Sequence, residues 1–160
     1  MQKTVELLKN AIEAEIRAQV FYAKAAELTN DDESRMVFIE LAGMEEGHAQ
    51  HLVDHFNKGP VAEATDLQAF LDETEADTDK LLEVVETPFV KDGSMDKVLD
   101  FAITQEHKAR DNYIALIGKM VDSEDRRYCE ELAQEEEEHA ARLLKLRRSL
   151  DMADEERPGM

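Results

Sequence analysis

The sequence has 160 residues, of which 42% are hydrophobic and 36% are charged, and its formal net charge is −19 at pH 7. This charge argues against nucleic acid or an anionic membrane as a partner, because both are bound mainly through lysine and arginine. The single cysteine excludes an internal disulfide, and no segment approaches the roughly 20 apolar residues of a membrane span. Without an apolar leader at the N-terminus, we expect a cytoplasmic protein.

Apolar residues at a spacing of three and four predict a first helix from about residue 4 to residue 28. Asn30-Asp31-Asp32 then forms a turn and provides an N-cap for a second helix, which runs to about Phe56. Gly59-Pro60 follows shortly afterwards and is expected to stop this helix. The N-terminal part of the chain therefore predicts a helical hairpin with a short loop.

A connection of about 40 residues follows this hairpin. Within it, Thr65-x-x-Gln68 resembles a capping box, which predicts a helix that continues to about Val85 before Pro88 ends it. A connection of this length can return along the whole bundle, because a helix of about 26 residues spans only about 39 Å.

The second hairpin has the same short loop as the first. Its first helix begins after Asp92-Gly93-Ser94 and is predicted to end near Val121, and Asp122-Ser123 then caps a last helix that runs to about Leu150. The apolar period is lost in residues 151–160, which we expect to form a frayed C-terminal tail.

The two hairpins are related by an internal repeat. Residues 11–53 align without gaps with residues 102–144, and 16 of these 43 positions are identical. Such a match indicates a duplication, with the two copies at roughly 5–56 and 95–147 in a single domain of residues 1–150. Two short-loop hairpins joined by a long crossover have the connectivity of a ferritin-like four-helix bundle. We therefore predict an all-α fold of this class.

Acidic residues and histidines fall on the apolar stripes of these helices. At about 100° per residue, Glu45 and His48 lie about 60° apart on the stripe that carries Leu41 and Leu52. The repeat places the same pattern on the last helix. Six such residues are predicted to face one bundle interior, namely Glu15, Glu45, His48, Glu106, Glu136 and His139.

Four buried carboxylates need compensating charge, because each unpaired ion would cost several kcal/mol. Two divalent cations supply it, and carboxylate and imidazole ligands without a thiolate favour iron or manganese. A glutamate from each of two helices with a Glu-x-x-His from each of the other two is the ligand set of di-iron carboxylate bundles. The six residues therefore predict two bound iron ions, with manganese or a mixed metal pair as the alternative.

The segments that carry these residues resemble a known family. The pattern AI-x-x-E-x-x-A-x-x-FY at 11–22 and LAGMEEGHA at 41–49 are similar to the rubrerythrin-type ferritin-like domain. The same holds for AITQEHKARDNY at 102–113 and LAQEEEEHA at 132–140. The resemblance implies that the six residues ligate two irons, with one histidine for each metal.

The sequence departs from this family at two points. Rubrerythrins carry a rubredoxin domain with four cysteines, whereas this chain has one cysteine, so we expect a separate electron donor such as a rubredoxin-like protein. Rubrerythrins also have an additional glutamate at the position of Ala109. The remaining ligand set is equally similar to that of bacterioferritin.

The resemblance predicts a non-haem di-iron redox protein, a peroxidase or ferroxidase that oxidises its diferrous centre with hydrogen peroxide or dioxygen. An iron-storage or iron-handling ferritin-like protein is the main alternative, and a manganese catalase is a further one. We expect a homodimer or a higher homo-oligomer.

Several neighbouring residues receive other interpretations. Tyr22 and Tyr113 follow Glu15 and Glu106 by seven residues, and we interpret them as core aromatics that also donate a hydrogen bond to a ligand carboxylate. Three glutamates on the last helix are predicted to form a solvated face, namely Glu135, Glu137 and Glu138. Gly43 and Gly47 lie opposite the metal face and are predicted to allow close packing against the crossover or a second subunit.

Overall fold

The computed structural model describes residues 1–77, 79–80 and 94–155 of the chain. The described part contains helices and no strand. The helices are α1 (Gln2–Leu28), α2 (Asp32–Phe56), α3 (Gly59–Ala64), α4 (Leu67–Ala76), α6 (Met95–Ile117) and α7 (Ser123–Glu155). This confirms the predicted all-α, ferritin-like architecture.

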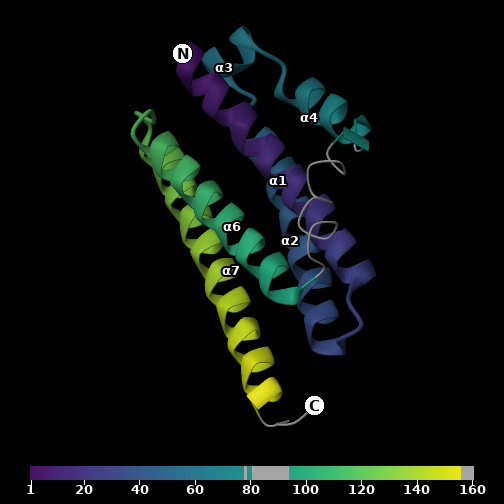
Figure 1. Ribbon diagram of the computed structural model, residues 1–160. Coiled ribbons are helices and arrows are strands. Elements are labelled where there is room, and N and C mark those ends of the chain that lie inside the picture. The colour runs from purple at the N-terminus through teal and green to yellow at the C-terminus, as the bar shows by residue number, and fades with distance from the viewer. Residues whose placement is uncertain (78, 81–93, 156–160) are drawn as a thin grey trace.

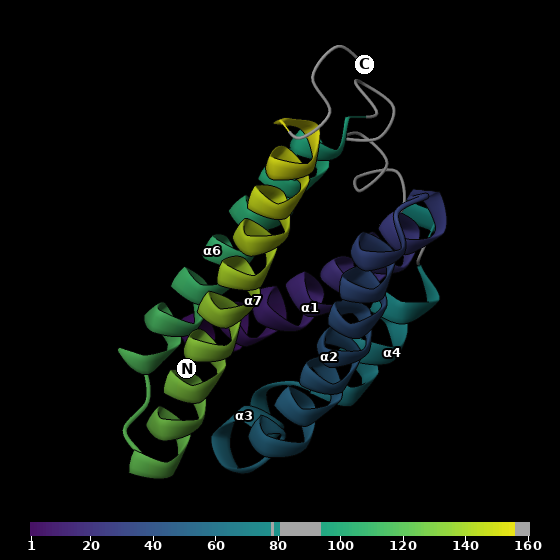
Figure 2. The same cartoon turned by 90° about the horizontal axis from the view of Figure 1, so that it is seen from below.

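The four long helices form two antiparallel hairpins that lie side by side (Figure 1). α1 packs against α2, α6 packs against α7, and α1 and α6 make the most extensive contact between the hairpins. The short helices α3 and α4 lie against α1 and α2, on the side away from α6 and α7 (Figures 1 and 2). None of the described helices combines the length and apolar character that crossing a membrane requires.

Side-chain caps set the starts of the long helices. The Asp31 carboxylate accepts a hydrogen bond from the Ser34 backbone N–H at 2.9 Å at the start of α2. Asp122 accepts from the backbone N–H groups of Glu124 and Asp125 at the start of α7. Each cap satisfies donors that the first helical turn leaves unpaired, as predicted from the sequence.

The crossover begins differently from the prediction. α2 ends at Phe56 as predicted, but Gly59-Pro60 then starts a further short helix, α3, because proline fits the first turn of a helix, where its missing N–H is not needed. The N-cap of α4 is Asp66, which accepts from the Ala69 N–H, so the predicted capping box at Thr65 is wrong. α4 ends at Ala76, so the predicted helix does not continue unbroken toward Val85, which itself lies outside the described residues.

The second hairpin differs from the prediction at its ends. α6 ends at Ile117 rather than near Val121, because the backbone closes there in tight turns from Lys119 to Leu116 and from Met120 to Ile117. α7 continues past the predicted end at Leu150 as far as Glu155. The last five residues, 156–160, lie outside the described part.

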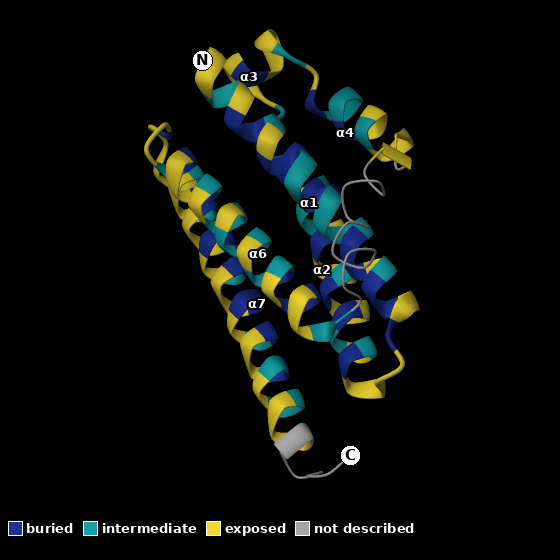
Figure 3. Cartoon of the chain, viewed as in Figure 1, coloured by how far each residue is buried: buried dark blue, intermediate teal, exposed yellow. Residues whose placement is uncertain are grey.

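The bundle interior consists of two apolar layers with a polar layer between them. One apolar layer includes Leu8, Leu52 and Leu116, and the other includes Phe38 and Leu99. Buried residues occupy the facing sides of the four long helices (Figure 3). The buried glutamates lie in the polar layer, where two hairpins of matching sequence face each other.

Candidate metal centre

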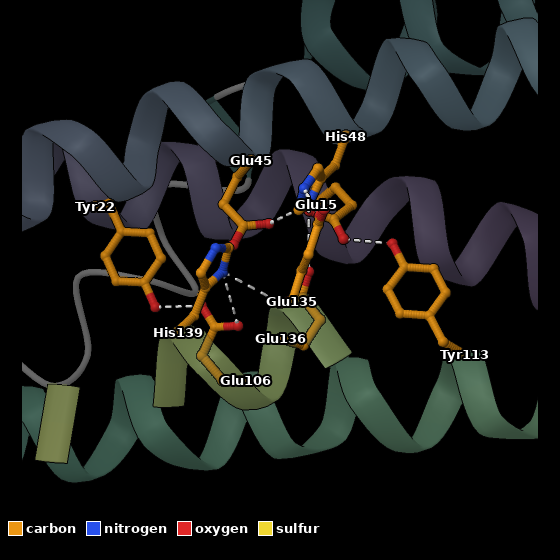
Figure 4. Close-up of polar contacts among 9 residues, drawn as sticks. All are labelled: Glu15, Tyr22, Glu45, His48, Glu106, Tyr113, Glu135, Glu136 and His139. Atoms are coloured by element: carbon orange, nitrogen blue, oxygen red, sulfur yellow. Dashed lines mark hydrogen bonds and ion pairs between the residues drawn. The ribbon is translucent and has the colours of Figure 1, made fainter. Parts of the chain in front are cut away.

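All six residues predicted from the sequence meet in this polar layer (Figure 4). α1 and α6 each contribute one glutamate, while α2 and α7 each contribute a glutamate and a histidine. The four glutamates and His139 are buried, with relative exposures of 0–3% and 7%, whereas the His48 side chain is 12% exposed. Because neither hairpin holds more than three of the six, the cluster forms only when the hairpins pack together.

The six residues form two overlapping groups. One contains Glu15, Glu45, His48 and Glu136, and the other contains Glu45, Glu106, Glu136 and His139. In each group, one potential ligand atom from every residue lies within 4.8 Å of the others. Glu45 and Glu136 belong to both groups, so these two carboxylates are placed to be shared between adjacent cations.

Both histidines direct Nδ1 toward the carboxylates. His48 Nδ1 lies 3.4 Å from Glu15 Oε2 and 3.3 Å from Glu136 Oε1. His139 Nδ1 lies 2.9 Å from Glu45 Oε1 and 3.6 Å from Glu106 Oε2. The two rings are nearly parallel, with centroids 5.9 Å apart. Nδ1 is therefore the nitrogen that each histidine offers to the cluster.

The donor atoms of the cluster fit a metal site. Buried polar atoms in proteins are nearly always hydrogen-bonded. Five buried atoms of the cluster have no hydrogen-bond partner within the described part of the chain: Glu15 Oε2, His48 Nδ1, Glu106 Oε2, Glu136 Oε1 and Glu136 Oε2. Carboxylate oxygen and imidazole nitrogen atoms that converge in this way are suitable ligands for divalent transition metals once their protons are released.

Glu45 and Glu136, which belong to both sets of potential ligands, are protonated when no metal is bound. Burial, followed by the charge of Glu15, raises the pKa of Glu45 well above its usual range and that of Glu136 to about 9. Burial also acts to raise the pKa of Glu15, but hydrogen bonds with Glu45, His48 and Tyr113 outweigh it and lower this pKa to about 2.

The pKa values of His48, His139 and Glu106 determine the remaining charges of the metal-free cluster. Burial acts to lower the pKa of His139, but hydrogen bonds to Glu106 and Glu136 raise it to about 12, and the pKa of His48 is raised for the same kind of reason. Burial acts to raise the pKa of Glu106, whereas hydrogen bonds with Glu136 and His139 lower it. The negative charges of Glu15 and Glu106 then balance the positive charges of the two imidazolium groups. The other two carboxyl groups are protonated and carry no charge.

Each tyrosine donates a hydrogen bond across the hairpin boundary. The Tyr22 hydroxyl of α1 donates to Glu106 Oε1 of α6 at 2.5 Å, and the Tyr113 hydroxyl of α6 donates to Glu15 Oε1 of α1. Burial and the nearby carboxylates raise the pKa of both tyrosines well above the usual value, so they stay protonated as donors. The hydrogen bonds from hydroxyl to carboxylate that the sequence predicted are thus present. Each joins a tyrosine in one copy of the repeat to a glutamate in the other copy.

Sequence reasoning missed one contact of the cluster. Glu135 was assigned to a solvated face, yet its Oε2 lies 2.6 Å from His48 Nε2, although the side chain is 47% exposed. A carboxylate on the outer nitrogen orients an imidazole and favours its other nitrogen as a metal ligand. The repeat places Met44 at the equivalent position, so His139 has no matching carboxylate.

The other histidines, His51, His55 and His107, belong to neither group of potential ligands. His55 Nε2 lies 2.8 Å from Asp125 Oδ1, and its ring stacks on Tyr128. No arginine enters the cluster from the neighbouring turn, because Arg110 pairs at the surface with Glu137.

Comparison with known proteins agrees with this arrangement. The sequence model of the rubrerythrin family matches residues 6–147, a range that includes all six residues of the cluster. The chain belongs to the rubrerythrin family. No curated protein and no solved structure matches the chain. Membership of the rubrerythrin family and the buried carboxylate–histidine cluster together indicate a metal-binding site.

Proposed function

We propose that this chain is a di-iron redox protein, in which hydrogen peroxide or dioxygen oxidises a diferrous centre held by the buried cluster. The observation that carries the proposal is the pair of overlapping groups that share Glu45 and Glu136. Four carboxylates compensate the charge of two divalent ions, and the repeat offers each ion one imidazole. Membership of the rubrerythrin family supports the same assignment.

The cluster residues divide into three roles under this proposal. Glu15 and His48 would hold one iron, Glu106 and His139 would hold the other, and Glu45 and Glu136 would lie between them. Two ferrous ions supply two electrons, which is the number that reduces one molecule of hydrogen peroxide to water. The protein's part is to fix the positions of the ligands and to limit access of water.

The tyrosines and the apolar layers support this role. Tyr22 and Tyr113 each donate a hydrogen bond to one oxygen of a carboxylate. The other oxygen of that carboxylate has no such partner among the described residues and is available to the cluster. Above and below the cluster, the two apolar layers exclude water along the bundle axis. Because the sequence contains a single cysteine, a four-thiolate site within these residues is excluded, and we infer that reduction uses a separate donor such as a rubredoxin-like protein.

Iron content after repeated aerobic additions of ferrous salt tests the proposal. We expect saturation at about two irons per chain, as in other di-iron carboxylate bundles. The double variant Glu45→Gln/Glu136→Gln should lose most of this iron. The matched control is Glu46→Gln/Glu137→Gln, which changes the exposed neighbour of each residue and should retain it.

Other outcomes of this experiment would change the assignment. Iron that continues to accumulate far beyond the ligand set, in a particle of many chains, would indicate storage and contradict the redox proposal. Retention of manganese in place of iron, with evolution of dioxygen from peroxide, would indicate a manganese catalase.

The oxidant is tested separately by mixing the diferrous protein with hydrogen peroxide or with air-saturated buffer and following the absorbance of the ferric product. Faster oxidation by peroxide would support a peroxidase, and faster oxidation by dioxygen would support a ferroxidase. No oxidation by either would contradict the proposed function.

A further inference from the structure

The cluster has two chemically different sides. All four glutamates line a pocket between α1 and α6, and neither histidine does. Both histidines line a separate groove between α2 and α7, where the side chains include Glu131, Glu135 and Glu138. A small molecule in the pocket would therefore meet the carboxylate side of the cluster, and one in the groove would meet the histidine side.

Small and aromatic residues form the pocket between α1 and α6. We call it the alanine pocket, after Ala14, Ala18, Ala102 and Ala109 in its wall. Phe21 and Phe101 also line it, and their ring centroids lie 5.2 Å apart. Polar and basic side chains complete the lining, among them Asn10, Arg17, Lys108 and Asn112. The lining of the pocket thus combines aromatic side chains with the carboxylates of the cluster.

Two alanines at equivalent positions of the repeat keep this pocket open. Ala18 of α1 corresponds to Ala109 of α6, and both are only partly buried. A longer side chain at either position would occupy part of the pocket that Glu15 and Glu106 also line. The width of the pocket therefore depends on the small size of these two residues.

The pocket is larger than hydrogen peroxide requires. Its volume is about 180 Å³. A water molecule occupies about 30 Å³ in the liquid, and an engineered apolar cavity of about 150 Å³ in another protein binds benzene. The alanine pocket consequently has room for a peroxide group together with an organic substituent of about four to six carbons.

We propose that the alanine pocket binds small organic hydroperoxides, with the O–O group at the glutamates and the alkyl group against Phe21 and Phe101. This inference rests on the proposed di-iron function and names a further substrate class for the same site. With iron bound, two ferrous ions would supply the two electrons that break the O–O bond and would become ferric. Two protons taken up from the solvent would complete the products, which are the alcohol and one molecule of water.

The residues that line the alanine pocket suit an organic hydroperoxide better than those that line the groove between α2 and α7. Organic ligands bind in concave sites with predominantly apolar walls and a few polar groups. The alanine pocket has four alanines and two phenylalanines in its lining, beside the four carboxylates and two basic residues. Charged residues and histidines together make up seven of the twelve residues that line the groove between α2 and α7, among them Glu131, Glu138 and Arg142. The alkyl group of a hydroperoxide would lose its favourable burial in that groove.

A binding experiment that involves no redox reaction tests the pocket directly. tert-Butanol, the alcohol produced from tert-butyl hydroperoxide, is titrated into zinc-loaded protein while the NMR signals of alanine methyl and phenylalanine ring groups are followed. We expect saturable shifts at Ala18, Ala109 and Phe101. Ala18→Leu and Ala109→Leu should each weaken binding by about tenfold or more, because the added carbons occupy the space of the ligand.

The matched control is Gly43→Leu, which adds the same side chain on the groove side, where a Cβ atom at residue 43 meets no described atom within 4 Å. This variant should bind tert-butanol like the parent protein. Absence of saturable shifts in the parent protein, or equal weakening in the control, would overturn the proposed site.

Kinetics with a series of peroxides provide a second test, first with the parent protein and then with the leucine variants. Diferrous protein should be oxidised by hydrogen peroxide and by tert-butyl hydroperoxide, but much more slowly by cumene hydroperoxide, whose organic group exceeds the pocket. The leucine variants should lower the rate with tert-butyl hydroperoxide about tenfold or more relative to the rate with hydrogen peroxide.

The outcomes separate this inference from the proposed function. Oxidation by hydrogen peroxide without oxidation by tert-butyl hydroperoxide would overturn the substrate class and leave the di-iron function in place. Oxidation by neither peroxide would contradict the di-iron function itself, even if tert-butanol binds. Equal rates with tert-butyl and cumene hydroperoxide would show that the alanine pocket does not limit the size of the substrate.

Discussion

Tyr22 in the first copy of the repeat donates its hydroxyl to Glu106 in the second copy, across the boundary between the two hairpins. The reciprocal bond from Tyr113 to Glu15 completes a symmetric pair. Each tyrosine also lies in one of the two apolar layers, Tyr113 in one and Tyr22 in the other. The two bonds therefore join the polar layer to the apolar layers and hold the hairpins in register.

Removal of either tyrosine hydroxyl should destabilise the metal-free protein. A hydrogen bond to a charged group contributes about 1.5–3 kcal/mol, and its loss leaves a buried carboxylate oxygen without a donor. Tyr22→Phe and Tyr113→Phe should each lower the free energy of unfolding by about this amount, measured by urea denaturation of the metal-free protein.

Tyr128→Phe is the matched control for these variants. The Tyr128 hydroxyl oxygen is buried but has no hydrogen-bond partner among the described residues, so its removal should leave the stability nearly unchanged or slightly increased. An equal loss of stability in all three variants would show that the cross-hairpin bonds are not the cause.

Gly43 offers a prediction of the opposite sign. A Cβ atom at this position would meet no heavy atom within 4 Å in the described part of the chain, so the predicted close packing against the crossover is not found there. Gly43→Ala should raise the free energy of unfolding by about 0.5–1 kcal/mol, because alanine loses less backbone entropy in a helix.

Gly59→Ala should change the stability in the opposite direction to Gly43→Ala. Gly59 has a φ of +53°, a conformation that costs an L-residue about 1–2 kcal/mol, so this substitution should destabilise the protein. Thermal unfolding measures both variants, and gel filtration tests the expected contact of Gly43 with a second subunit. Destabilisation by Gly43→Ala together with dissociation of an oligomer would contradict the prediction and place Gly43 in an interface.

Local sequence patterns were sufficient to predict the four long helices and the six residues of the cluster, but not the short helix α3 or the N-cap of α4. The apolar period within one helix shows which residues face inward, and the repeat shows that Glu15 and Glu106 occupy equivalent places. Contacts between helices are not encoded in that period. The pairing of Glu135 with His48 and the crossing of Tyr22 to the other hairpin depend on how the hairpins pack, which a single helix cannot reveal.

Binding of two divalent ions should release about four protons per chain. Without metal, the raised pKa values keep Glu45, Glu136 and both histidines protonated at neutral pH, with Glu136 at about 9 and His139 at about 12. All four groups must lose a proton to act as ligands. Because protons compete with the metal, the apparent affinity should increase as the pH rises from 6 to 8.

Titration of metal-free protein with ferrous or zinc salt in weakly buffered solution, with a pH indicator, measures this release. Calorimetry in buffers of different ionisation enthalpy provides an independent count. The variant Glu46→Gln, which alters an exposed residue, should release the same number of protons as the parent protein. Release close to zero, with an affinity independent of pH, would show that the cluster is already deprotonated without metal.

Glu135 should make the two metal positions unequal. It contacts His48 Nε2 at 2.6 Å, whereas the repeat places Met44 at the equivalent position for His139. Loss of a carboxylate that orients a metal-binding histidine lowers metal affinity by about 10–100-fold. Glu135→Gln should therefore weaken one of two metal-binding steps by about tenfold and leave the other nearly unchanged.

Competition with a chelator, followed over two resolved binding steps, measures this effect. Glu138→Gln is the matched control, because Glu138 lines the same groove but, within the described residues, makes no ion pair with either histidine of the cluster. If both variants weaken the metal equally, the effect of Glu135 comes from general negative charge in the groove. If neither weakens it, the Glu135–His48 contact does not orient the imidazole. Selective weakening by Glu135→Gln alone would show that one carboxylate outside the repeat pattern distinguishes two otherwise equivalent metal positions.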